Sequence, residues 1–121
     1  MKPLTAQELH NLGMNIVGEK LQAMGYEFVA INSTLKRHPQ FVLYKKGEPT
    51  IFVLVKVTSN LEQAQSFDVI WMETFKQHAI AQEAKVWFAG VGIANAESVE
   101  MPVFKDQPYY VAFDDFIKIL D

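Results

Sequence analysis

Near the start of the chain, apolar residues recur at the three- and four-residue spacing of a helix face. The stripe consists of Leu9, Leu12, Ile16, Val17, Leu21 and Met24. Thr5 and Glu8 form a capping-box pattern before it, and Leu4 is placed to contact Leu9 as a hydrophobic staple. Gly25 then supplies the residue that tolerates a positive φ at a helix end. The pattern predicts an amphipathic helix between Thr5 and Gly25.

Three strand-like segments follow, over residues 26–32, 39–45 and 50–58. The second and third are separated by the short turn sequence Lys46-Gly47-Glu48-Pro49, which predicts a hairpin. Residues 51–57 lack the apolar–polar alternation of a half-exposed strand, so this third strand is expected to be covered on both faces.

A second helical stripe runs through Phe67, Ile70, Trp71, Thr74, Phe75, His78 and Ala79. We favour Ser66 as its N-cap, with a loop before it, although Ser59 and Glu62 form an alternative capping box. This register predicts Trp71 in the core and Met72 off the stripe. Met72 and Phe67 would then extend an apolar surface for a partner.

Residues 85–91 predict a fourth strand, which we expect to end where Gly90, Gly92 and Asn95 follow. Gly90-Val91-Gly92 is interpreted as a turn, since a dinucleotide-binding loop needs a third glycine and a helix start. Residues 109–113 predict an edge strand because a proline precedes them. Asp114 is expected to cap a short final helix ending at Leu120.

The order helix, three strands, helix, strand predicts an α/β fold with a mixed sheet flanked by helices. With 121 residues, 50% of them hydrophobic, the chain is expected to form a single domain over residues 1–121. Residues 1–5 lack a signal-peptide core and no apolar run is long enough for a membrane span, so we expect a cytoplasmic location without membrane contact.

Cysteine is absent, which excludes disulfides, thiolate metal sites and a cysteine nucleophile. The net charge of −3 is not typical of a nucleic-acid-binding protein. Two basic clusters, at residues 35–38 and 45–46, are interpreted as ordinary surface charge. His10, His38 and His78 lack metal-ligand spacing, and we expect His78 to be a hydrogen-bonded core or rim residue. No catalytic residue, metal site or cofactor is predicted.

Lys56 interrupts the apolar third strand, where a lysine without a partner is rarely buried. Two readings are open. The side chain either emerges at the strand end with its ammonium group in water, or it lines a polar pocket that binds an anion. The first reading is the more ordinary for a strand-end lysine.

The element order and the residues Pro39-Gln40 and Leu54-Val55-Lys56 resemble the PD-(D/E)xK nucleases, which have the restriction-endonuclease-like fold. The resemblance covers about residues 5–91. It implies an α-β-β-β-α-β core in which acids at positions 40 and 54 bind a metal beside the lysine. Here Gln40 and Leu54 replace both acids, and neither supplies the carboxylate oxygens that Mg²⁺ prefers. Glu19 is a further candidate, because some relatives place an acid on the first helix, but a solvent-exposed position is favoured.

Residues 8–10, 38–42 and 68–76 are also similar to small uncharacterised bacterial proteins that often carry the name of one subunit of the sodium-translocating NADH-quinone reductase. The true reductase subunit contains a cysteine-ligated iron–sulfur cluster, a flavin domain and a membrane anchor. A chain of 121 residues without cysteine has no room for these parts, so the name implies no mechanism here.

Together these observations favour a non-catalytic binding or protein-interaction module on a degenerate nuclease-like fold. Its remnant pocket would comprise Gln40, Leu54, Lys56 and Glu19, and its partner would be another protein or a second copy. The alternatives are a divergent metal-dependent nuclease, in which Glu19 or Glu48 replaces the missing acids, and a nucleic-acid-binding protein that uses Lys36, Arg37 and Lys56.

Overall fold

The computed structural model describes residues 1–121. The helices are α1 (Ala6–Ala23) and α2 (Val69–Ala81), with a single 3-10 turn, η1 (Leu61–Gln63), before α2. The strands are β1 (Glu27–Ile31), β2 (Phe41–Tyr44), β3 (Ile51–Thr58), β4 (Lys85–Asn95), β5 (Tyr109–Ala112) and β6 (Ile117–Leu120). No helix combines the length and apolarity that crossing a membrane would require.

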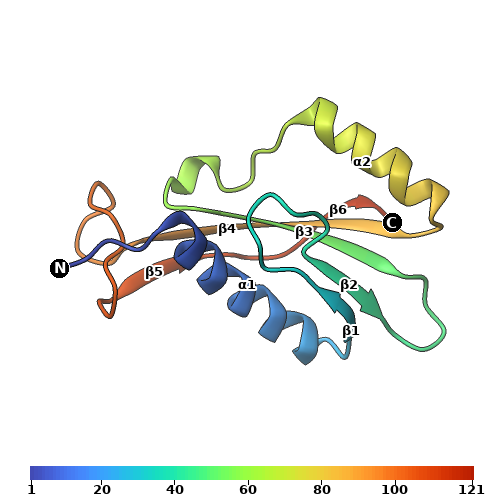
Figure 1. Cartoon of the computed structure of the whole chain (residues 1–121), viewed down its shortest axis with the longest axis horizontal. Helices are drawn as coiled ribbons and strands as arrows, with labels where there is room; N and C mark the ends of the chain where they lie inside the picture. Colours follow the sequence, from blue (N-terminus) through green and yellow to red (C-terminus); the bar gives the residue numbers. More distant parts are fainter.

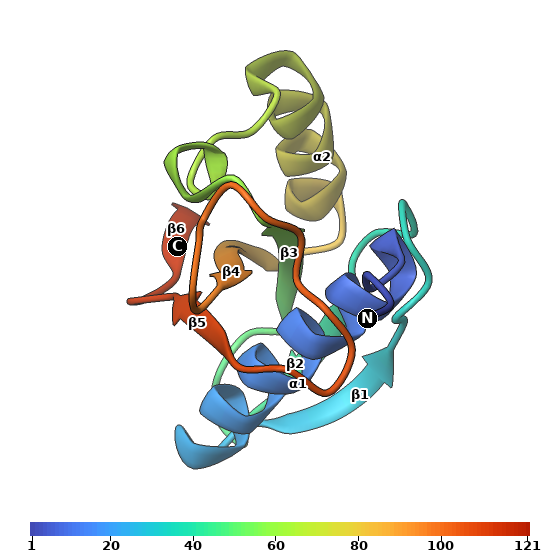
Figure 2. The same cartoon turned by 90° about the vertical axis from the view of Figure 1, so that its left-hand side faces the viewer.

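All six strands form one open mixed sheet, in which β1-β2-β3-β4-β5 are successive neighbours and β6 also pairs with β4. β1, β2 and β3 are antiparallel neighbours, whereas β3 and β4 are parallel and are joined through α2. α1 and α2 lie on opposite sides of β3 and β4 (Figure 1, Figure 2). The predicted hairpin, the mixed sheet and the helices on both faces are therefore confirmed.

On the α1 face, the helix forms as its sequence pattern predicts. The Thr5 side chain accepts a hydrogen bond from the Glu8 backbone N–H, and Glu8 accepts one from the Thr5 N–H. Gly25 follows the helix with a φ of +92°, as the pattern required. Fourteen buried residues form the core on this face, among them Val17, Leu21 and Val53.

On the α2 face, the core is smaller, with seven buried residues. β3 contributes Phe52 and Leu54 to this face, while Val53 and Val55 point to the α1 side. Residues of both faces are buried in the same strand, which explains the missing alternation.

The predicted register of α2 is wrong. Its N-cap is Asp68, whose side chain accepts a hydrogen bond from the Trp71 backbone N–H, and not Ser66. Met72 is 4% exposed and packs on the sheet with Phe75 and Ala79, whereas Trp71 is 40% exposed. Apolar residues occur all around this helix, so their spacing alone did not identify the buried side.

The predicted break after Val91 is also wrong, because β4 continues to Asn95. The glycines serve close packing instead of a turn. A Cβ atom at Gly90 would lie 2.0 Å from the Ala64 carbonyl oxygen, and one at Gly92 would lie 2.5 Å from Leu61 Cδ2. The segment between β3 and α2 therefore sits directly on these two residues.

The chain ends in a strand and not in the predicted helix. β5 pairs with residues 92–95 of β4, as an edge strand should, and leaves the N-terminal half of that edge free. β6 pairs there with residues 86–88. The backbone hydrogen bonds offered by the long β4 strand thus decide the conformation of residues 117–120.

Candidate functional site

Three of the four residues in the predicted remnant pocket come together on the α2 face. Phe41 pairs with Val53 across β2 and β3, so the preceding residue, Gln40, lies opposite Leu54. Lys56 follows Leu54 on the same face, because alternate residues of a strand share a face. Glu19 is not with them, since α1 lies on the other side of the sheet.

Gln40 is 1% exposed, and its carboxamide is occupied by internal hydrogen bonds. Its Oε1 accepts from the Val55 backbone N–H at 2.8 Å. Its Nε2 donates to the Arg37 carbonyl oxygen at 2.9 Å and to His38 Nδ1 at 2.8 Å. Because the amide nitrogen only donates, His38 Nδ1 is the acceptor and the imidazole proton lies on Nε2. Gln40 therefore extends the β2–β3 hydrogen bonding past the end of β2.

Lys56 is neither fully in water nor directed at an acid. Its ammonium group donates to the backbone carbonyls of Gln63 and Ser66, at 2.6 Å and 2.7 Å. Gln65 fastens the same segment through a 2.9 Å hydrogen bond to the Gly90 carbonyl. Lys56 thus holds the connection between β3 and α2 against the sheet, a role that neither reading of the sequence included.

Beside Lys56 lies a small pocket beneath the first turn of α2, which we call the Trp71 pocket. Its volume is about 260 Å³. Its apolar lining consists of Leu54, Val55, Phe67, Trp71, Met72 and Phe88, and its polar lining of His38, Lys56, Ser66 and Asp68. The His38 ring packs edge-on against Trp71, with ring centroids 4.8 Å apart, and Trp71 stacks on Phe75 at 5.4 Å.

Several of these lining residues were missed in the sequence. Phe67 reaches the pocket because it packs against Phe88, at a centroid distance of 5.1 Å. Asp68 could have been recognised as an N-cap from its position three residues before Trp71. No local pattern connects His38 with Trp71, because their contact forms only when α2 folds back over the sheet.

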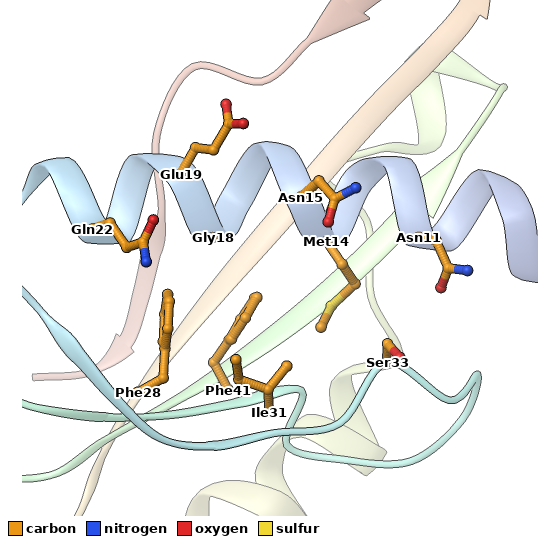
Figure 3. Close-up of a pocket in the computed structure, with 10 residues that line it drawn as sticks. All are labelled: Asn11, Met14, Asn15, Gly18, Glu19, Gln22, Phe28, Ile31, Ser33 and Phe41. Atoms are coloured by element: carbon orange, nitrogen blue, oxygen red, sulfur yellow. The ribbon is translucent and has the colours of Figure 1, made fainter. Parts of the chain in front are cut away.

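Glu19 instead lies at a larger groove on the opposite face, between α1 and β1 (Figure 3). The apolar floor of this groove consists of Met14, Phe28, Ile31 and Phe41, and its volume is about 590 Å³. The Glu19 carboxylate points away from Phe28 and Phe41 (Figure 3). The favoured solvent-exposed position of Glu19 agrees with this placement.

The histidines differ from the expectation. His78 is exposed and stacks on Phe52 and does not form a side-chain hydrogen bond. His10 is the buried one, at 4% exposure, and its Nε2 has no hydrogen-bond partner. Burial, together with the nearby His38, lowers the pKa of His10. No three His, Asp or Glu side chains are close enough to share a metal ion.

A family model matches residues 7–119, nearly the whole chain. The chain belongs to the family defined by the domain of unknown function DUF8840. No curated protein and no solved structure matches it significantly. The functional argument for this DUF8840 domain therefore starts from the chemistry of its own pockets.

Proposed function

We propose that this protein is a non-catalytic binding module built on a restriction-endonuclease-like core. The observation that carries the proposal is the use made of Gln40, Leu54 and Lys56. In the nuclease pattern these positions serve a metal ion, but here all three serve packing or internal hydrogen bonding.

The topology supports this core. α1 precedes three antiparallel strands, and α2 then leads into β4, which runs parallel to β3. Positions 40, 54 and 56 converge on one face near the C-terminal end of β3, as the proposed ancestry requires. Leu54 is 2% exposed and packs in the α2-face core, so a hydrocarbon occupies the position of a metal ligand.

No observation favours the divergent nuclease. Glu19 lies across the sheet from Lys56, and Glu48 lies in the β2–β3 turn, beyond the opposite end of β3. For nucleic-acid binding, Lys36 and Arg37 remain exposed, but the Lys56 ammonium is held by two backbone carbonyls. The second basic cluster is divided, because Lys45 donates to the Met24 carbonyl and covers the Tyr26 ring.

The test combines nuclease assays with thermal unfolding. Duplex, single-stranded and branched DNA are incubated with the protein and Mg²⁺ or Mn²⁺, and unfolding is followed with and without millimolar metal. We expect no cleavage and no rise in the melting temperature, because binding to the native state is what would raise it. Metal-dependent cleavage that Lys56→Ala abolishes, and that the matched control Lys76→Ala retains, would refute the proposal.

A further inference from the structure

We infer that the Trp71 pocket binds a small molecule with a single-ring or branched apolar body and one carboxylate group. The inference rests on the proposed binding function and specifies its ligand. It draws on the shape of the pocket, the composition of its walls and the charge of Lys56.

The walls suit a compact apolar body. Leu54, Met72 and Phe88 are almost completely buried and form a hydrocarbon surface, while Phe67 and Trp71 add aromatic faces. A pocket of about 260 Å³ is smaller than the ~300–1,000 Å³ of typical ligand sites. It therefore fits a body of about one ring in size and excludes a nucleotide or an extended peptide.

Lys56 supplies the polar contact that orients such a body. An ammonium group has three N–H donors, and two of them are taken by the carbonyls of Gln63 and Ser66. Those carbonyls satisfy hydrogen bonds but carry no formal charge. None of the three ion pairs in the protein includes Lys56. One donor and a full positive charge thus remain for an anion.

The other charged group in the lining, Asp68, already has its own compensation. Its carboxylate accepts a hydrogen bond from the Trp71 backbone N–H at 2.9 Å and sits at the positive end of the α2 dipole. His38 Nδ1 is engaged by Gln40, so this imidazole takes part in the pocket through its ring face and Nε2. Lys56 is consequently the group in the lining whose charge has no partner, which favours an anionic ligand.

Trp71 provides the means to detect binding. It is 40% exposed at the pocket, whereas the other tryptophan, Trp87, is 3% exposed in the core of the opposite face. A ligand in the pocket would cover Trp71 and leave Trp87 unchanged. Trp71→Phe therefore identifies the source of any fluorescence change.

The experiment titrates the full chain with benzoate, benzamide and inorganic phosphate, and follows tryptophan fluorescence. We expect saturable quenching by benzoate and at least about tenfold weaker binding of benzamide, which lacks the charge that Lys56 contacts. Phosphate should bind at least as weakly as benzamide, because it has no apolar body. Equal binding of benzoate and benzamide, equal binding of benzoate and phosphate, or no binding of benzoate at millimolar concentration would each overturn the inference.

Two variants localise the site. Leu54→Phe should fill the floor and abolish benzoate binding without touching Lys56. Lys56→Met should reduce benzoate affinity about tenfold or more and leave benzamide affinity unchanged, while the control Lys76→Met should change neither. If Lys56→Met does not fold, Leu54→Phe and the benzoate–benzamide comparison still decide. Benzoate binding that survives in folded Leu54→Phe would contradict the site.

These results are independent of the nuclease test. Loss of the carboxylate inference would leave the absence of cleavage unaffected. Metal-dependent cleavage would instead refute the proposed function, whatever the affinity for benzoate.

Discussion

The two faces of the sheet are built differently. The α1 face holds fourteen buried core residues beneath a capped, 18-residue helix. The α2 face holds seven, and the segment leading to α2 is fastened by the side chains of Lys56 and Gln65. Only on the α2 face do the positions of the nuclease pattern meet a pocket.

This difference separates stability from recognition. Burial of apolar surface is the dominant stabilising term in folding, so the α1 face should provide most of the stability. The α2 face leaves a small cavity, a partly exposed tryptophan and an unpaired ammonium charge. A thinner core leaves room for a ligand, while the larger core on the other face keeps the domain folded.

The largest expected effect tests this division with one truncation on each face. Leu21→Ala opens a cavity in the fully buried α1-face core and should lower the free energy of unfolding by about 2–5 kcal/mol. Met72→Ala, which borders the existing pocket, should fall near the lower limit of that range, at about 2 kcal/mol. Urea denaturation of both variants measures the difference. A greater loss for Met72→Ala would reverse the proposed division.

The second prediction concerns the close contact between β4 and the segment before α2. Gly90→Ala places a methyl group against the Ala64 backbone carbonyl, so the backbone must move, at about 1–3 kcal/mol. The matched change Gly92→Ala meets the end of the flexible Leu61 side chain and should be less destabilising. Gly90→Ala should also weaken benzoate binding, because it displaces the carbonyls that hold Lys56. If both variants unfold at the same denaturant concentration, the backbone contact does not distinguish the two glycines.

The smallest expected effect is a pH dependence from the α1 face. Burial lowers the pKa of His10 in the folded protein, so below about pH 6.5 the unfolded chain binds the proton more readily. The contribution of neutral His10 is therefore fully present above that pH and decreases as the pH falls toward the folded-state pKa. His10→Leu should reduce the stability lost between about pH 7.5 and 5.5 in urea titrations. His78→Leu, on the exposed side of α2, is the control for removal of an imidazole, and an unchanged pH dependence in His10→Leu would contradict the assignment.

Local signals predicted the elements whose formation depends on neighbouring residues. Thr5, Glu8 and Gly25 identified α1, and the turn at residues 46–49 identified the hairpin. The prediction failed where a distant contact decides. Gly90 resembles a strand breaker in the sequence, yet its missing Cβ admits the carbonyl of Ala64, which lies in a different segment of the chain.

The sequence by itself determined that an acid is missing at positions 40 and 54, and that β3 is buried on both faces. Only the tertiary structure decided that Lys56 serves two carbonyls, that Glu19 lies across the sheet and that Trp71 borders a pocket. The physical reason is the range of the interactions. Capping, turn formation and hydrophobic periodicity act within a few residues, whereas the partner of a charge and the walls of a pocket come from segments that only folding brings together.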